Sequence, residues 1–109
     1  MPHFIMLTRL VSEEVRPSHT IRRKEEIVAK NIRKACPQVK WVADYAVLGP
    51  YDYLDVFEAP DIETAMKVSA MVRSLAGAHT EVWPALQWKR HDEVMRDVTE
   101  CVGRCEIAA

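Results

Sequence analysis

The sequence predicts an α+β fold of the ferredoxin-like type: a four-stranded antiparallel sheet with two helices on one face, followed by a C-terminal helix. Four short runs rich in apolar and β-branched residues alternate with two longer amphipathic segments in the order β-α-β-β-α-β. A length of 109 residues also suits a single domain. Because both helices cover the same face, we expect a second copy of the chain to cover the other.

The first third of the chain supplies one strand and one helix. Residues 3–10 form a nearly continuous apolar run, which is typical of a central strand. A loop is expected over residues 12–16. A helix is then expected from an N-cap at Thr20 to about Ala35, since Pro37 prevents its continuation. Its apolar positions lie on one 3.6-residue stripe: Ile21, Val28, Ile32 and Ala35.

The middle of the chain supplies a hairpin and a second helix. Residues 39–48 and 51–57 are rich in β-branched and aromatic side chains. The Gly49-Pro50 pair between them predicts a tight connection between two antiparallel strands. A second helix is expected to begin after an N-cap at Asp61 and to stop at Gly77.

The last third supplies a strand and a helix. Residues 79–86 alternate polar and apolar side chains until Pro84, which predicts an edge position or a bulge. A charged stretch after Trp88 is expected to continue as a helix to Cys101, followed by a loose tail from Gly103.

Composition excludes some classes of function. Fifteen basic and sixteen acidic side chains leave a net charge of −1, which argues against a nucleic-acid binder held by bulk charge. No window approaches the length of a membrane span, and the apolar start meets Arg9 too soon for a signal peptide. With no export signal, we expect the three cysteines to be reduced and the protein to be cytoplasmic, without a membrane partner.

Two segments resemble a known family. Leu48-Gly-Pro-Tyr-Asp-Tyr53 and Asp55-Val-Phe-Glu-Ala-Pro-Asp61 resemble the glycine-tyrosine-aspartate (GYD) domain family of small bacterial proteins, whose members carry a Gly-x-Tyr-Asp turn and a downstream Glu-Ala-Pro-Asp. Leu7-Thr-Arg-Leu10 is also similar to the family's first strand. The resemblance implies a ferredoxin-like domain of the dimeric α+β barrel group, which we assign to residues 1–88. Residues 89–109, which the resemblance does not cover, are expected to form a C-terminal helix and tail. It implies no established activity.

The predicted hairpin register places two aspartates opposite each other. On one face the expected pairs are Ala46 with Tyr53, Asp44 with Asp55, and Val42 with Phe57. On the other face they are Tyr45 with Leu54, Ala43 with Val56, and Trp41 with Glu58. The second set is the better helix-packed core, so the aspartates are expected on the open face, toward a partner subunit.

Two carboxylates this close repel, so one is expected to hold a proton near neutral pH or the pair to recruit a cation. That arrangement suits a general acid or base, or a site for a hard metal ion. The alternative is that each aspartate is salt-bridged across a dimer interface by Arg9, or lies at a wet sheet end. The candidate ligand-binding residues are Asp44, Asp55, Tyr53, Phe57 and Arg9. The candidate catalytic residues are Asp44, Asp55 and His79; for His79, on a strand with Glu81, a solvated edge is the alternative.

The remaining motifs are weaker evidence for a functional site. Cys101-x-x-x-Cys105 is neither a Cys-x-x-Cys redox motif nor a complete zinc site, so both cysteines are taken as structural or incidental. Basic residues on the first helix are interpreted as a solvated face, with an acidic partner or nucleic acid as the alternative. No metal or cofactor is expected.

Three functions remain open. The first is a homodimer that binds a small molecule in a cleft between the open sheet face and the partner subunit. The second is a cofactor-independent enzyme that uses the same cleft for proton transfer. The third is an accessory module that binds other proteins and holds no ligand.

Overall fold

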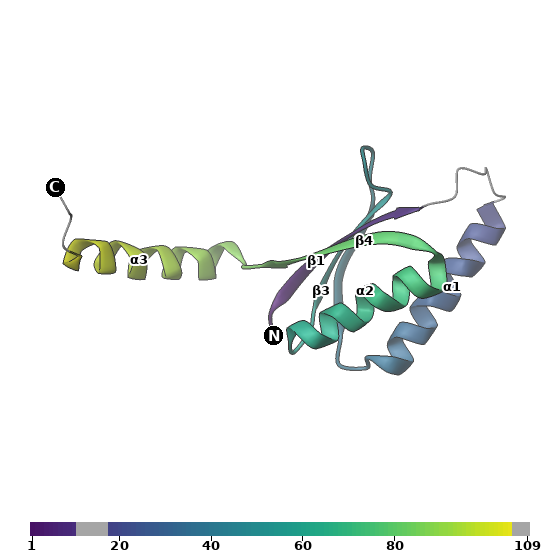
Figure 1. Cartoon of the computed structure of the whole chain (residues 1–109), viewed down its shortest axis with the longest axis horizontal. Coiled ribbons are helices and arrows are strands. Elements are labelled where there is room, and N and C mark those ends of the chain that lie inside the picture. The colour runs from purple at the N-terminus through teal and green to yellow at the C-terminus, as the bar shows by residue number, and fades with distance from the viewer. Residues whose placement is uncertain (11–17, 106–109) are drawn as a thin grey trace.

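The computed structural model describes residues 1–10 and 18–105, and within them the elements follow the predicted order. They are β1 (His3–Leu10), α1 (Ser18–Ala35), β2 (Lys40–Ala46), β3 (Tyr53–Glu58), α2 (Ile62–Ala76), β4 (Ala78–Ala85) and α3 (Trp88–Arg104). The strands form one antiparallel sheet in the order β2-β3-β1-β4, with α1 and α2 on one face (Figure 1). This confirms the predicted fold class. The loop expected over residues 12–16 lies outside the described residues.

Two helix boundaries differ from the prediction. α1 begins at Ser18, so Thr20 lies in its first turn and is not the N-cap. α3 runs through Gly103 to Arg104, so the loose tail expected from Gly103 was wrong. A single glycine costs a helix only about 1 kcal/mol, and the N–H of Cys105 closes the last turn by donating to the carbonyl of Cys101. None of the described helices is long and apolar enough to cross a lipid bilayer.

The core lies between the sheet and the two packed helices. Phe57 on β3 is fully buried (0% exposed), and its ring stacks on Phe4 at a centroid distance of 5.7 Å. The other large apolar side chains buried around it are Met6, Ile32, Val68 and Val72. Phe57 was predicted to face a ligand on the open sheet face. That prediction was wrong, because β3 turns Phe57 toward the helices.

A β-bulge in β2 explains part of this error. The register matches the prediction from Ala43 to Ala46, and Asp44 lies directly opposite Asp55. The register then shifts between Trp41 and Ala43, so Trp41 pairs with Phe57 in place of Val42. The Trp41 ring lies 5.2 Å from that of Phe57 and joins the core, while Val42 is left exposed.

The turn that carries the Gly-x-Tyr-Asp motif fastens the hairpin to the neighbouring strand. Gly49 adopts a φ of 141°, a conformation that side chains with a Cβ rarely take. The N–H of Asp52 donates to the carbonyl of Thr8 at 2.8 Å, and its carboxylate accepts from the N–H of Leu10 at 2.7 Å. The motif's aspartate therefore stabilises the end of β1 and has a structural role here.

The predicted limits of the second helix and the edge position of the last strand are confirmed. The Asp61 carboxylate accepts from the N–H of Thr64 at 2.7 Å, and Gly77 ends α2 in the left-handed conformation with a φ of 62°. Within the described sheet β4 pairs only with β1, and it carries Pro84, whose missing N–H an edge strand tolerates.

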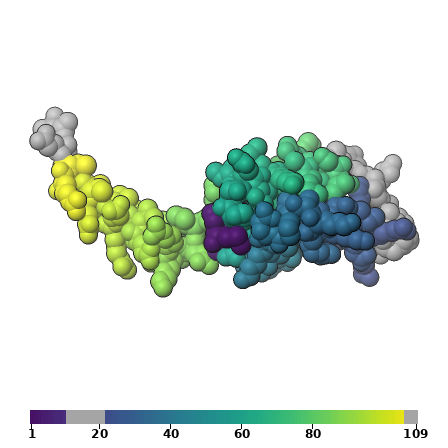
Figure 2. Space-filling view, turned by 90° about the horizontal axis from the view of Figure 1, so that it is seen from below, coloured from purple at the N-terminus to yellow at the C-terminus, as the bar shows by residue number. Residues whose placement is uncertain are grey.

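α3 projects away from the rest of the fold. It leaves the end of β4 as an extended arm (Figures 1 and 2), and the molecule measures 62 × 30 × 20 Å. No residue of α3 is buried, although its apolar side chains recur along one side at Met95, Val98 and Val102. The described part of the chain therefore consists of a compact sheet-and-helix body and an unpacked helix.

Candidate functional site

The opposed aspartates face α1, and not the open side of the sheet as predicted. A cavity of about 860 Å³ lies between α1 and strands β1, β2 and β3, and both Asp44 and Asp55 line it. Tyr53, two residues before Asp55 on the same face of β3, donates a hydrogen bond from its hydroxyl to Glu25 Oε1 on α1 at 2.7 Å. The predicted face was wrong because the aromatic cluster around Phe57 makes this side of the sheet the core.

The two carboxyl groups behave as a proton-sharing pair. Partial burial, a hydrogen bond with Asp44 and the negative charges of Asp44 and Glu25 raise the pKa of Asp55 to about 8. At neutral pH the Asp55 carboxyl group is therefore mostly protonated and can donate to the exposed Asp44 carboxylate. A single proton relieves the repulsion that two ionised aspartates would suffer at this spacing.

Tyr53 extends this polar cluster toward α1. Burial and the acidic groups around its hydroxyl, Glu25 first among them, raise the pKa of Tyr53 to about 12. Tyr53 therefore stays protonated and remains a hydrogen-bond donor across the physiological range. Glu25, Tyr53, Asp55 and Asp44 together form a strip of acidic and hydroxyl groups along one side of the cavity.

The rest of the cavity is mostly apolar. Val28 and Ile32 of α1, Trp41 of β2 and Val72 of α2 contribute to its walls. Thr8 of β1 also lines it and is only 4% exposed.

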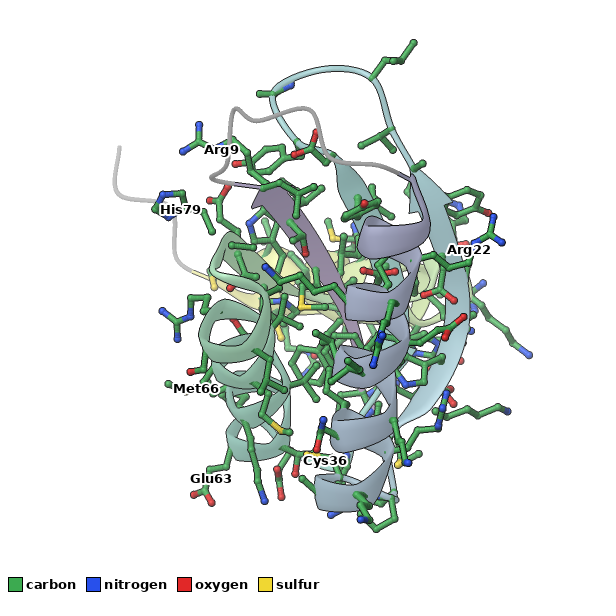
Figure 3. All side chains as sticks on the ribbon, turned by 90° about the vertical axis from the view of Figure 1, so that its right-hand side faces the viewer. Arg9, Arg22, Cys36, Glu63, Met66 and His79 are labelled. Atoms are coloured by element: carbon green, nitrogen blue, oxygen red, sulfur yellow. The ribbon has the colours of Figure 1, made fainter. Side chains whose placement is uncertain are left out.

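Arg9 and His79 do not belong to this site. Strand alternation turns Arg9 to the opposite face from Thr8, where it lies directly across from His79 of β4. Figure 3 shows both side chains at one end of the molecule, on the side away from α1. Arg9 therefore does not neutralise the aspartates of its own chain, and a salt bridge from Arg9 of the partner subunit stays a prediction. His79 lies on the face opposite the aspartates of its own chain and is not placed to join them in proton transfer.

Sequence reasoning missed Glu25, Thr8 and Trp41. Glu25 could have been found from the sequence. It lies between Ile21 and Val28 on the apolar stripe of α1, where a charged side chain is unexpected. Trp41 had no such signal, because the bulge that redirects it is not visible in the residue pattern. Thr8 had no signal either. It lies in the apolar run of residues 3–10, where both alternating sets of side chains are mostly apolar, so the sequence does not show which set faces a site.

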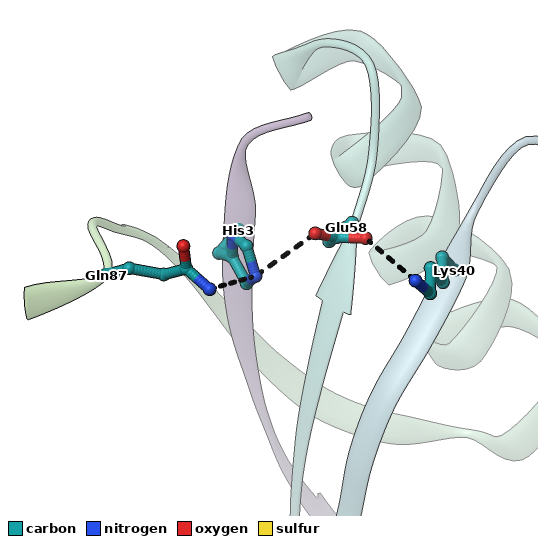
Figure 4. Close-up of polar contacts among 4 residues, drawn as sticks. All are labelled: His3, Lys40, Glu58 and Gln87. Carbon is teal, nitrogen blue, oxygen red and sulfur yellow. Dashed lines mark hydrogen bonds and ion pairs between the residues drawn. The ribbon is translucent and has the colours of Figure 1, made fainter. Parts of the chain in front are cut away.

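The open sheet face carries a separate set of residues. Its apolar side chains are Ile5 and Leu7 of β1, Leu54 and Val56 of β3, Tyr45 of β2 and Trp83 of β4. At one end, Glu58 lies 3.3 Å from His3 Nε2 and 4.0 Å from Lys40 Nζ, and Gln87 contacts the same nitrogen of His3 at 3.5 Å (Figure 4). These polar contacts join β1, β2 and β3, so one end of the open sheet face is polar and charged.

Histidine, cysteine, aspartate and glutamate are the side chains that could bind a metal ion. No group of three His, Cys, Asp or Glu side chains within residues 1–10 and 18–105 is arranged to hold a metal ion. Cys101 and Cys105 are exposed and unbonded, and Cys36 is a buried free thiol beside the core.

Comparisons with known proteins agree with the motif in the hairpin. A protein of Thermus thermophilus named as a glutamine synthetase and cystathionine beta-lyase binding protein is 32% identical over 89 residues, which is 79% of this chain and 90% of that protein. A crystal structure of the leucine response regulatory protein LrpA of Mycobacterium tuberculosis has a similar fold, with a TM-score of 0.53 and 13% identity. That match covers 79% of this chain and 51% of LrpA, so the chain spans about half the length of that protein. The GYD domain family matches residues 4–95. The chain therefore belongs to the GYD domain family.

Proposed function

We propose that this protein binds a small organic molecule in the cavity between α1 and the sheet. The cavity volume of about 860 Å³ falls within the range of small-molecule sites. The observation that carries the proposal is the Asp44–Asp55 pair, because a proton-sharing pair beside apolar walls offers polar recognition next to apolar contact area. This cavity lies within one chain, whereas the sequence predicted a cleft between two subunits.

An NMR fragment screen tests the proposal. The ¹H–¹⁵N spectrum of the full chain is recorded with aromatic and aliphatic amines, alcohols and acids. We expect shift changes to gather at residues that line the cavity. The variant Ala29→Trp fills the cavity from α1 and should abolish them, whereas Ala35→Trp, at the exposed end of the same helix, should not. Fragments that bind only to the open sheet face, or equally well to Ala29→Trp, would refute this function.

A second candidate function is protein association through the open sheet face, first of all as a homodimer. Tyr45 is 59% exposed and Trp83 is 47% exposed on this face, and large apolar side chains gathered on a surface mark interaction sites. The relative from Thermus thermophilus is named as a protein that binds two enzymes, which supports a role in protein contacts. From the sequence, the homodimer was expected to cover Tyr53, Phe57 and Val42. Tyr53 and Phe57 lie on the helix-covered face and only Val42 is exposed, so Tyr45 and Trp83 are the residues that support a dimer through the open face.

Sedimentation tests the homodimer. The chain of 12.5 kDa should sediment at micromolar concentration as a species of about 25 kDa. Trp83→Glu places a charge on the open face and should yield the monomer. Met66→Glu, on the exposed side of α2 in the opposite layer (Figure 3), should remain dimeric. A wild-type chain that sediments only as the monomer would contradict self-association.

A further inference from the structure

We propose that the cavity is specific for an organic cation, a primary amine carried on an apolar body, with its ammonium group held between Asp44, Asp55 and Thr8. This inference rests on the proposed function and names the class of ligand. It follows from how acceptors, charge and apolar walls are distributed in the cavity.

The acceptors match the donors of an ammonium group. A primary ammonium group has three N–H donors and no acceptor. Asp44 and Asp55 lie directly opposite each other on β2 and β3. Thr8 pairs with Tyr53 while Met6 pairs with Asp55, so Thr8 lies one diagonal step from Asp55, within reach of a bridging group. Thr8 also lines the cavity and is only 4% exposed. An ammonium group at this point would give all three side chains a donor.

The charges favour a cation at this point. The described titratable side chains around the pair on the helix-covered face are Glu25 and Lys24 of α1 and Tyr53 of β3. Tyr45 of β2 borders the cavity but alternates onto the open face, and Arg33 lines the cavity about two turns further along α1. α2 contributes only uncharged residues to the lining. Apart from Asp44, the charge that acts on Asp55 is thus another carboxylate, Glu25. An anionic ligand would meet repulsion there, and a neutral ligand would leave the pair's charge unpaired.

The apolar walls fit the body of such a ligand. Val28 and Ile32 of α1 face the Trp41 side of the sheet across the cavity. An aromatic or branched aliphatic body placed between them would be removed from water. Such burial contributes affinity in proportion to the apolar area covered.

Binding of a cation would release a proton. Asp55 holds its proton at neutral pH, and a positive charge beside it favours the ionised form. The complex would then pair one ammonium group with two carboxylates. Affinity should therefore rise with pH up to about 8, where Asp55 ionises without help.

Titration calorimetry with three probes tests the inference. The probes are 2-phenylethylamine, 2-phenylethanol and phenylacetate, which share the aromatic body and differ in charge. At pH 6.5, in buffers of different ionisation enthalpy, we expect the amine to bind at least tenfold more tightly than either other probe and to release close to one proton per site. Asp55→Asn should weaken amine binding at least tenfold and abolish the proton release. Asp97→Asn, the same change on the exposed α3, should alter neither.

A second variant keeps the test independent of the stability of Asp55→Asn. Thr8→Val preserves the shape of the side chain and removes its hydroxyl, so it should weaken the amine several-fold and leave the alcohol unchanged. If the alcohol or the acid binds in the cavity as tightly as the amine, the cation inference is wrong and the small-molecule proposal stands. If no probe shifts the cavity residues in the NMR spectrum, the inference is also wrong, and the wider fragment screen decides the proposed function separately.

Discussion

The shared proton of the Asp44–Asp55 pair should make the fold less stable as the pH rises. Folding raises the pKa of Asp55 to about 8, whereas an aspartate in the unfolded chain has a pKa of about 3.9. Between these two values the folded state holds a proton that the unfolded state has lost. The free energy of unfolding must therefore fall through this window as the pH increases.

The expected magnitude follows from the same linkage. A group that is protonated only in the folded state lowers the free energy of unfolding by about 1.4 kcal/mol per pH unit, or about 2.7 kcal/mol from pH 5 to pH 7. Asp55 is only partly buried, so solvent screening reduces this value, and we expect a loss of about 1 kcal/mol. Asp55→Asn keeps the shape of the side chain and removes the titration, so the variant should lack this loss.

Urea unfolding at pH 5, 6 and 7 gives the free energy of unfolding of wild type and variant. The difference between the two cancels the contributions of the other titrating groups. The stability advantage of Asp55→Asn over wild type should grow by about 1 kcal/mol between pH 5 and pH 7. Asp97→Asn, exposed on α3, should show a constant difference. If the curves of wild type and Asp55→Asn run parallel, the aspartates do not share a proton and the electrostatic interpretation of the site fails.

Three further predictions concern the fold. Phe57→Ala removes the central ring of the core and should lower the free energy of unfolding by about 3–5 kcal/mol in urea, and a loss below about 1 kcal/mol would contradict the core assignment. Asp61→Ala removes the N-cap of α2 and should cost about 1 kcal/mol, whereas Asp61→Ser, which can also cap, should cost much less. A chain ending at Gln87 should keep the melting temperature of the full chain, since α3 buries nothing, and a fall of more than about 5 °C would show that α3 packs on the body.

Local chemistry made the hairpin predictable. The turn at Gly49-Pro50 fixes which residues face each other, so the opposition of Asp44 and Asp55 followed from counting outward along both strands. The limits of α2 were equally local, because a capping aspartate and a left-handed glycine act on the residues beside them. Such features depend on a few neighbouring residues, which one sequence displays in full.

The face of the sheet could not be predicted in the same way. β3 carries Tyr53 and Phe57 on one face and Leu54 and Val56 on the other, so hydrophobicity does not choose between them. The choice depends on Trp41, which the bulge turns onto the core side. The prediction placed the aspartates on the open face, but α1 leaves a cavity on the helix-covered face that both aspartates line. The contact between Tyr53 and Glu25 joins residues 28 positions apart and requires the placement of α1.

The projecting helix divides the molecule into parts with different local stability. The Cα radius of gyration is 18.2 Å, against about 13 Å for a compact domain of this length. A 17-residue helix without tertiary contacts is marginal in water, and the pairs Arg90–Glu93 and Arg104–Glu100 each add only about 0.2–0.5 kcal/mol. In the isolated chain, amide hydrogens of α3 should therefore exchange with solvent through local fraying, on a timescale set by the helix alone. Amides of β1, hydrogen-bonded between two strands, should exchange only when the whole body unfolds.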